Sequence, residues 1–393
     1  MARASSGQQL GLTHSARVAL TEVIIHGPLA RAELARRLSL SPPSLTKIAR
    51  PLLDTGYIRE RPAALGGSMG RPSLPLEVVP ERAFFIGMKL TSDALFTVLV
   101  DLASAVRVEL FRPLINTEVD YVLEEIADVV NGLAAQHSGI AGIGIGLAGK
   151  NQPNDTYVHY SRFLGWHNVP LATLVEERVG LPVVLANDVR ALAAAEHWFG
   201  VATDVSNFAL VTAGAGIGCA IVLHDRVIQG VRGSAGSLAH FPVDDRGPLC
   251  PLGHRGCASA FATSQAITQA IGTALGRLGM SLAEAADLAR SGHPLARRVF
   301  DDAGRAVGTL VGQLNNILDV DLIILSGEAD AIFELAAEPI ASAIAHACEA
   351  PIQARIVVRP LGFSAWARGA AVVAIQRHID LGLEWDMRVR PVA

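Results

Sequence analysis

Residues Gly230–Phe261 read GVRGSAGSLAHFPVDDRGPLCPLGHRGCASAF and form the most distinctive stretch of the chain. One histidine, His240, is followed by Cys250 and Cys257, which flank a glycine-rich turn. A histidine followed by closely spaced cysteines is typical of a small loop that a metal ion stabilises, with zinc as the usual metal. His240, Cys250 and Cys257 are therefore candidate metal ligands. The alternative is that the two cysteines are reduced thiols in a loop that needs no metal.

Length and composition narrow the class of protein. The 393 residues exceed one ordinary domain, so the length predicts two or three units. Half of the residues are hydrophobic and 5% are aromatic, which is typical of a well-buried α/β protein. We expect neither a membrane span nor secretion, because no long apolar run and no secretory signal occur. Four cysteines in so long a chain do not form a disulfide framework, which favours the cytoplasm.

Charge is distributed unevenly along the chain. Residues 1–80 contain ten Lys and Arg residues and five Asp and Glu residues, a net charge of +5. Because the whole chain has a formal net charge of −4, the remaining residues carry −9. A basic N-terminal segment on an acidic body indicates that this segment alone meets a polyanion. The alternative is chance clustering of surface charges.

The N-terminal segment has the pattern of three short helices. Apolar residues at helical spacing predict helices over His14–His26 and Arg31–Leu38. A third helix is expected to begin after Ser41, which is a suitable N-cap and precedes two prolines. Pro51 lies inside this third helix and is expected to kink it or to end it near Ala49.

Two helices joined by a tight turn form a helix-turn-helix, whose second helix lies in the major groove of DNA. Small polar and basic residues near the start of that helix supply phosphate and base-edge contacts. The candidate DNA-binding residues there are Ser41, Ser44, Thr46, Lys47 and Arg50. Strands at Gly56–Arg61 and Leu74–Val79 predict a hairpin wing, with Arg71 at its glycine-rich tip positioned for a minor groove. Double-stranded DNA is the predicted partner, and a small protein-interaction domain is the alternative.

The rest of the chain alternates strands and helices, which predicts an α/β body of two lobes around a cleft. The expected strands are a hairpin over Arg82–Ala105, then Gly139–Gly149, Leu181–Leu185, a pair within Asn207–Leu223, Asp319–Gly327 and Ala354–Val358. The expected helices are Glu118–Gln136, Pro170–Val179, 191–199, Ser264–Gly279, Ser281–Ser291, His293–Ile317, Ala329–Ala347 and Gly362–Arg377.

The sequence resembles the ROK family, which is named for repressors, open reading frames and sugar kinases. Ala235-Gly236-Ser237-Leu238-Ala239-His240 is similar to the family pattern A-G-E-x-G-H, and Cys250–Ser259 is similar to C-x-C-G-x-x-G-C-x-E. Residues 27–58 resemble the winged helix-turn-helix of ROK repressors. The resemblance covers residues 14–377. It implies a winged helix-turn-helix over residues 1–80 on a two-lobed, actin-like (ASKHA, ROK-type) sugar-kinase-like body, with lobes over 81–205 and 206–393. The final helix, about 362–378, is expected to pack back on the first lobe.

The resemblance also implies an effector site. Asn187 and Asp188 stand where the family has a catalytic aspartate beside an asparagine that holds sugar hydroxyls. The alternative for Asp188 is that it only caps the following helix. Gly149 lies in a loop similar to one that closes over the sugar. The sugar-contacting segment contributes Ser237, His240 and Ser259, with both serines in place of family glutamates.

The zinc ligands of the family are retained in part. His240, Cys250 and Cys257 match family ligands, whereas Leu252 stands in place of a third cysteine. A structural zinc site needs four ligands. His254 is the candidate that would replace the missing cysteine as the fourth ligand, at a different spacing in the sequence.

Lys89 argues against an enzyme. Actin-like sugar kinases carry G-x-D-x-G-G-T, whose aspartate positions Mg²⁺ and phosphate. Here the residues are Gly87-Met88-Lys89-Leu90-Thr91, and a lysine cannot hold Mg²⁺. Gly214, Gly216 and Gly218 match a second phosphate loop, but any tight β-hairpin uses such glycines, and this structural interpretation is favoured. We therefore expect no catalytic residue, no ATP and no kinase activity.

The predicted function is that of a ROK-family transcriptional regulator, with repression as the expected action. A homodimer or homotetramer would bind pseudopalindromic operator DNA, and a small carbohydrate or carbohydrate derivative in the interlobe cleft would control it. Lys89 and Arg190 make an anionic effector an option. The alternatives are an ATP-dependent sugar kinase with a regulatory DNA-binding head and a ROK regulator that binds no ligand.

Overall fold

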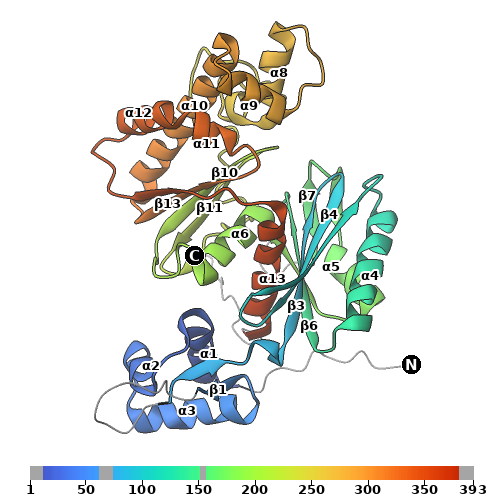
Figure 1. Ribbon diagram of the computed structural model, residues 1–393, viewed down its shortest axis with the longest axis vertical. Coiled ribbons are helices and arrows are strands. Elements are labelled where there is room, and N and C mark those ends of the chain that lie inside the picture. Colours follow the sequence, from blue (N-terminus) through green and yellow to red (C-terminus); the bar gives the residue numbers. More distant parts are fainter. Residues whose placement is uncertain (1–11, 62–73, 151–155, 380–393) are drawn as a thin grey trace, which may run out of the picture. The chain divides into compact units, whose positions relative to one another are not determined.

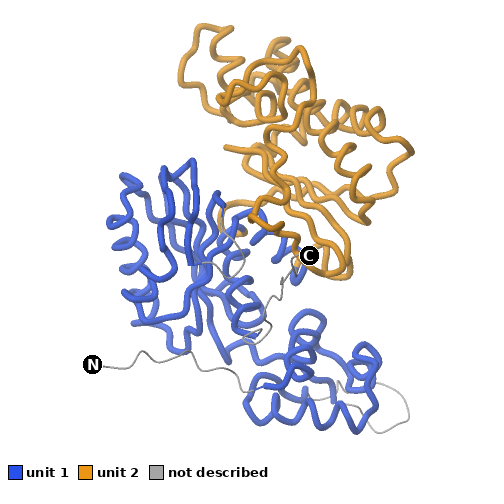
Figure 2. The backbone as a smooth tube through the Cα atoms, turned by 180° about the vertical axis from the view of Figure 1, so that it is seen from behind, with its two compact units in different colours: residues 1–199, 366–393 blue, residues 200–365 orange. Residues whose placement is uncertain are grey.

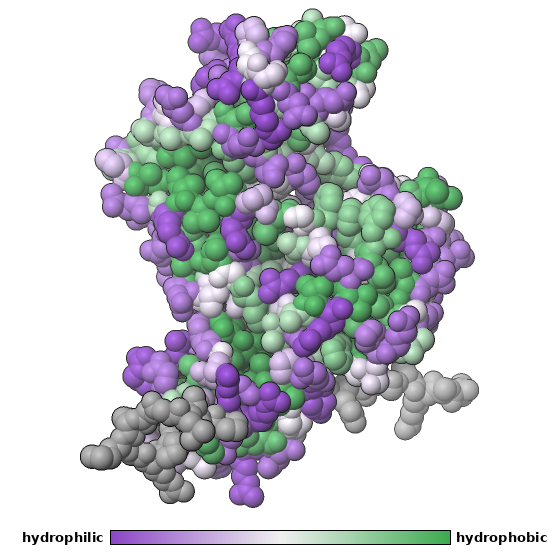
Figure 3. Space-filling model, viewed as in Figure 1, coloured by the Kyte–Doolittle hydropathy of each residue, from purple (hydrophilic) through white to green (hydrophobic). Residues whose placement is uncertain are grey.

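The computed structural model describes residues 12–61, 74–150 and 156–379. The chain divides into two compact units, residues 1–199 with 366–393 (unit 1) and residues 200–365 (unit 2), as Figure 2 shows. Among the described residues, no helix is long and apolar enough to cross a membrane. On the face shown in Figure 3, hydrophobic and hydrophilic residues are intermixed and form no continuous apolar belt.

Unit 1 begins with the helical head that the sequence predicts. Its elements are α1 (His14–His26), α2 (Arg31–Arg37), α3 (Pro42–Asp54), β1 (Ile58–Glu60) and β2 (Leu76–Val78), and the two strands pair antiparallel. The Oγ atom of Ser41 accepts a hydrogen bond from the Ser44 amide at 3.4 Å, which confirms Ser41 as the N-cap of α3. The tip of the wing, including Arg71, lies outside the described residues.

Of the two outcomes expected for Pro51, a kink or an end of the helix near Ala49, the second is wrong, because α3 continues to Asp54. Pro51 is exposed, whereas Ala49 and Leu52 on either side of it are buried. Packing of this apolar face therefore holds the helix together although Pro51 lacks one backbone donor.

The body of unit 1 is a five-stranded sheet in the order β5-β4-β3-β6-β9. β3 is antiparallel to β4 and parallel to β6, and β6 is parallel to β9. Helices α4 and α5 cover one face, whereas α6 and α13 cover the other (Figure 1). The elements are η1 (Pro80–Arg82), β3 (Phe84–Leu90), β4 (Ala94–Asp101), β5 (Val106–Pro113), α4 (Val119–Gln136), β6 (Ile140–Leu147), β7 (Val158–Ser161), β8 (Trp166–Val169), α5 (Leu171–Val179), β9 (Val183–Asn187), α6 (Asp188–Phe199) and α13 (Phe363–Ile379).

Glycines bring α13 into backbone contact with the elements beside it. A Cβ atom on Gly87 of β3 would overlap the carbonyl of Ala367, and one on Gly144 of β6 would overlap the carbonyl of Ala370. Within α13, a Cβ atom on Gly369 would lie 2.6 Å from the carbonyl oxygen of Ala191 in α6. Because protein interiors are close-packed, these contacts fix the register of α13 against β3, β6 and α6.

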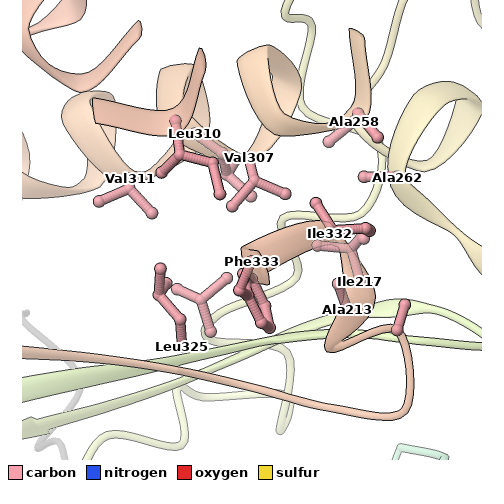
Figure 4. Close-up of a cluster of buried hydrophobic side chains, with 14 of the residues drawn as sticks. Ala213, Ile217, Ala258, Ala262, Val307, Leu310, Val311, Leu325, Ile332 and Phe333 are labelled. Carbon is pink, nitrogen blue, oxygen red and sulfur yellow. The ribbon is translucent and has the colours of Figure 1, made fainter. Parts of the chain in front are cut away.

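Unit 2 is built on a second five-stranded sheet, in the order β12-β11-β10-β13-β14. β10 pairs antiparallel with β11 and parallel with β13. The elements are β10 (Phe208–Ala213), β11 (Ile217–Leu223), β12 (Arg226–Val227), α7 (Ser259–Ala262), α8 (Ser264–Ala274), α9 (Leu282–Arg290), α10 (Pro294–Leu318), β13 (Leu322–Ser326), α11 (Ala331–Leu335), α12 (Ala337–Ala347) and β14 (Arg355–Val358). In its core, Val307, Leu310 and Val311 of α10 face Leu325 of β13 and Phe333 of α11 (Figure 4).

The helix predicted over Ala329–Ala347 is wrong in one respect, because the structure divides it into α11 and α12 at Ala336. Ala336 has φ −121° and ψ 31°, outside the helical region. Pro339 then lies in the first turn of α12, where a backbone donor is not needed.

Candidate functional site

The exposed face of α3 carries the predicted DNA-binding residues that the structure describes. Its apolar residues, including Leu45 and Leu52, are buried. On the opposite face the exposed residues are Ser41, Ser44, Thr46, Lys47 and Arg50. Lys47 makes no hydrogen bond or ion pair with any described residue. The side chain of Arg50 is 82% exposed, and its Nε atom lies 3.8 Å from Asp54 Oδ2 at the exposed end of α3. Cationic side chains on α3 are therefore available to a polyanion.

Several arginines elsewhere in the head are already paired with glutamates. Arg31 contacts Glu60 at 2.6 Å, Arg36 contacts Glu33 at 2.7 Å and Arg59 contacts Glu77 at 2.7 Å. These pairs neutralise charge on α2 and the wing strands. Lys47 of α3, by contrast, has no acidic partner among the described residues.

In unit 1, Lys89 of β3 forms a buried ion pair with Asp188, the first residue of α6. Their side chains are 5% and 7% exposed. The N-cap hydrogen bond of α6 is made by Asn187, whose Oδ1 atom accepts from the Arg190 amide at 3.4 Å. Asp188 therefore does not serve simply as the cap of this helix.

Trp366 of α13 completes this arrangement, since the Lys89 Nζ atom lies 5.0 Å from the centroid of its ring. We call Lys89, Asp188 and Trp366 the Lys89 cluster. Asn187 lies beside it and donates to the Gly149 carbonyl at 3.3 Å. The ion pair compensates the charge of Lys89, which weakens the idea that Lys89 binds an anionic effector. Arg190 is buried, and this burial lowers its pKa.

In unit 2, His240, Cys250 and Cys257 come together as a metal triad. The Nδ1 atom of His240 lies 3.5 Å from the Cys250 sulfur and 3.6 Å from the Cys257 sulfur. Tetrahedral zinc with ordinary Zn–N and Zn–S bonds places nitrogen and sulfur ligands about 3.6 Å apart. The donor set and spacing therefore fit zinc.

The surroundings of the triad also favour a bound cation. Burial acts to raise the pKa of the Cys250 thiol, but hydrogen bonds from the backbone at Leu252 and His254 and contact with Cys257 lower it overall. Leu252 is 54% exposed, and its hydrocarbon side chain has no atom that could bind a metal ion. The His254 ring lies 5.0 Å from the His240 ring, centroid to centroid.

Ser259 adjoins the triad, whereas Ser237 is an exposed residue of the preceding loop. The Oγ atom of Ser259 lies 3.3 Å from His240 Nδ1 and 3.2 Å from the Cys257 sulfur. Ser237 follows Gly236, whose φ of 80° and close approach to the Cys219 carbonyl exclude a side chain there. The predicted effector residues Ser237, His240 and Ser259 thus belong to one loop region of unit 2.

Glu328 covers the glycine-rich turn between β10 and β11. A Cβ atom on Gly214 would overlap the Glu328 carboxylate, and its distance to the Glu328 amide nitrogen would be 3.4 Å. Gly327, with φ 116°, packs against Ala213 and so directs the chain across the turn. Sequence reasoning missed Glu328 and Trp366, because neither lies in a motif that identifies a site.

Comparison with known proteins identifies the family. The model of the ROK family matches residues 87–377. The chain belongs to the ROK family. It is 29% identical to the N-acetylglucosamine repressor of Escherichia coli O6:H1 (strain CFT073), over 77% of each chain.

Two solved structures extend this comparison. A crystal structure of a ROK family transcriptional regulator, a homologue of the E. coli Mlc protein, has a TM-score of 0.80 and 28% identity and covers 93% of this chain and 95% of its own. A ROK glucokinase from Streptomyces griseus, in complex with glucose and AMPPNP, has a TM-score of 0.66 and 25% identity and covers 75% of this chain and all of its own. These structures confirm the predicted fold, a helix-turn-helix head on an actin-like sugar-kinase body.

Proposed function

We propose that this ROK protein is a DNA-binding transcriptional regulator, with repression as the expected action. The observation that carries the proposal is the exposed face of α3 with Lys47 and Arg50, on a head in which arginines of α2 and the wing strands are paired with glutamates. A helix of this kind places its N-terminal side chains at base edges and phosphates in a major groove. A repressor and a transcriptional regulator among the similar proteins support the proposal.

We further propose that Ser41, Ser44, Thr46, Lys47 and Arg50 contact DNA, with Arg71 as an additional contact from the wing. The expected operator is pseudopalindromic and the expected assembly is a homodimer or homotetramer, because operator symmetry mirrors protein symmetry. The test begins with selection of binding fragments from a random DNA pool. Mobility shifts should then show binding that α3 substitutions abolish. Failure to enrich any sequence would contradict the proposal.

The effector is proposed to be a carbohydrate or a carbohydrate derivative. The residues proposed to contact it are those that the sequence motifs indicate, namely Gly149, Asn187, Asp188, Ser237, His240 and Ser259. The name of the E. coli relative and the glucose bound to the S. griseus enzyme support this ligand class. Calorimetric titration with N-acetylglucosamine, glucose and their 6-phosphates tests it.

Phosphoryl transfer is not part of the proposed function, although ROK kinases share this body. A catalytic aspartate must be able to accept a proton from a hydroxyl. Asp188 instead bonds the Lys89 ammonium, at a position where a lysine cannot hold Mg²⁺. In unit 2 the Glu328 carboxylate lies against Gly214 of the glycine turn, in the space that a phosphate held by this turn would need. Incubation with MgATP and a panel of hexoses should therefore form no ADP above background.

Zinc is the proposed metal of the triad His240, Cys250 and Cys257. When bound, zinc would cross-link the loop as a structural ion. The fourth ligand is proposed to be His254, because its ring already lies against that of His240 and Leu252 supplies no donor. Metal analysis of the purified protein, compared with a His254→Ala variant, tests this assignment.

A further inference from the structure

Trp366 has a buried polar group with no partner. Its residue is 3% exposed, and among the described residues nothing accepts a hydrogen bond from its Nε1 atom. Trp166 in the same unit shows the usual arrangement, since its Nε1 donates to the Thr117 carbonyl at 2.7 Å. Buried donors are almost always satisfied, so an unpaired one indicates an acceptor that arrives from elsewhere.

The surroundings of Trp366 indicate what kind of acceptor fits. Lys89 lies over the ring, and the Lys89 ammonium is bonded to Asp188. The cluster therefore combines an unused donor, a carboxylate with remaining acceptor capacity, and no net charge. Hydroxyl groups both donate and accept, whereas a phosphate brings two negative charges toward Asp188. An uncharged polyhydroxyl ligand matches this cluster better than a phosphorylated one.

We propose that Trp366 is an effector-binding residue, whose indole N–H donates to an uncharged polyol that also contacts Asp188. This inference rests on the proposed effector site and extends it to a residue and a ligand charge that the sequence motifs do not indicate. Trp366 also starts the part of α13 that belongs to unit 1.

Helix α13 connects Trp366 to the head. α13 is held in register by the glycine contacts of Gly87, Gly144 and Gly369. Its other end carries His378, twelve residues or about 18 Å along the helix, and His378 contacts Tyr57 of the head at 2.9 Å. Because the helix is packed as a unit, a displacement at Trp366 is carried to Tyr57. We expect ligand binding to change how the head is held, provided that the ligand has different affinities for two arrangements of α13 and the head.

The test uses the full-length protein and a Trp366→Phe variant, which keeps the aromatic face toward Lys89 and removes only the N–H donor. Titrations with N-acetylglucosamine, glucose and xylose, each with its phosphate, give the affinities. We expect the sugar that binds best to bind the variant about tenfold more weakly, which corresponds to one hydrogen bond. The uncharged sugar should bind more tightly than its phosphate. Trp166→Phe is the matched control and should bind like the wild type.

Two readouts separate the outcomes. Saturating sugar should change the hydrogen exchange of α3 amides in the wild type but not in Trp366→Phe at the same concentration. Wild-type affinity in Trp366→Phe, together with the same sugar-induced change in α3 exchange as in the wild type, would overturn the role of Trp366 alone, while the effector site would stand. Tighter binding of the phosphate would overturn the inferred ligand charge. If the wild type binds none of these sugars or sugar phosphates, both the proposed effector class and this inference are wrong.

Discussion

The hydroxyl of Tyr57, in the DNA-binding head, lies 2.9 Å from the Nε2 atom of His378 at the end of α13. Phe85 of β3 packs edge-on against His378, with ring centroids 5.3 Å apart. The guanidinium of Arg82 lies 4.8 Å from the centroid of the Tyr57 ring and donates to the Thr55 carbonyl. Residues of the head, β3 and α13 thus share one hydrophobic cluster. The head is attached to the body through α13, and His378 is part of that attachment.

His378 gives this attachment a pH dependence. Burial, with a smaller contribution from Arg82, lowers the pKa of His378 to about 4, whereas an unfolded histidine titrates near 6.5. Between these values the unfolded chain binds a proton that the folded chain does not. Stability is therefore complete above about pH 6.5 and falls as the pH approaches 4, by about 3 kcal/mol at most. Urea unfolding from pH 7.5 to 4.5 should show this loss, and His378→Gln should lose less. If the free energy of unfolding of the wild type and of His378→Gln falls equally with pH, protonation of His378 is not the cause of the loss.

The Lys89–Asp188 pair should behave as a unit. Both side chains are buried, so Lys89→Met leaves an unpaired carboxylate and should cost about 3–5 kcal/mol of stability. Lys89→Met combined with Asp188→Asn removes both charges and should recover most of that loss. The single substitution Asp188→Asn completes a double-mutant cycle, and chemical denaturation gives the free energy of unfolding of each protein. Additive effects of the two substitutions would show that the ion pair is not formed in solution.

The sequence predicted the elements that have strong periodicity or turn chemistry. The head helices and the hairpin β3–β4 follow from apolar spacing and from Ser41 and Ser92-Asp93 at their boundaries. The edge strand β5 was missed, because its residues are mostly exposed and so do not alternate between buried and exposed. The metal triad was predicted from spacing alone. The Lys89 cluster was not, because β3, α6 and α13 meet only in the folded chain and Trp366 has no local signature.

Lys47 offers the sharpest test of the DNA interface. It has no ion-pair partner among the described residues, so Lys47→Ala removes a phosphate contact without disturbing the head. We expect affinity for the selected DNA to fall and the slope of log K against log salt to become shallower by about 1. Arg36→Ala is the control, since Arg36 is paired with Glu33 and lies on α2. If both variants show the same slope as the wild type, Lys47 does not contact phosphate.

Zinc should stabilise unit 2 through the metal triad. Removal of the ion with a chelator should lower the melting temperature, and Cys257→Ser should lower it to the same extent without further loss on chelation. Leu252→Cys supplies a thiolate at the exposed position in the loop and should raise zinc affinity. Zinc content is measured on the same samples. A melting temperature that chelation leaves unchanged, together with metal-free protein, would favour a loop of reduced thiols.

Glu328 should exclude nucleotides from unit 2. Its carboxylate lies against Gly214 and occupies the space that a phosphate bound by this turn would need. The melting temperature of the wild type should therefore not shift in about 10 mM ADP or pyrophosphate. A ligand concentration of about 10 mM is high enough to detect a dissociation constant in the millimolar range. Glu328→Ala should bind either anion at least about tenfold more tightly. Glu338→Ala removes a carboxylate from α12 and serves as the control for net charge. Equal anion binding by the wild type and Glu328→Ala would mean that the turn rejects phosphate through its backbone conformation, and that the carboxylate over Gly214 has no part in it.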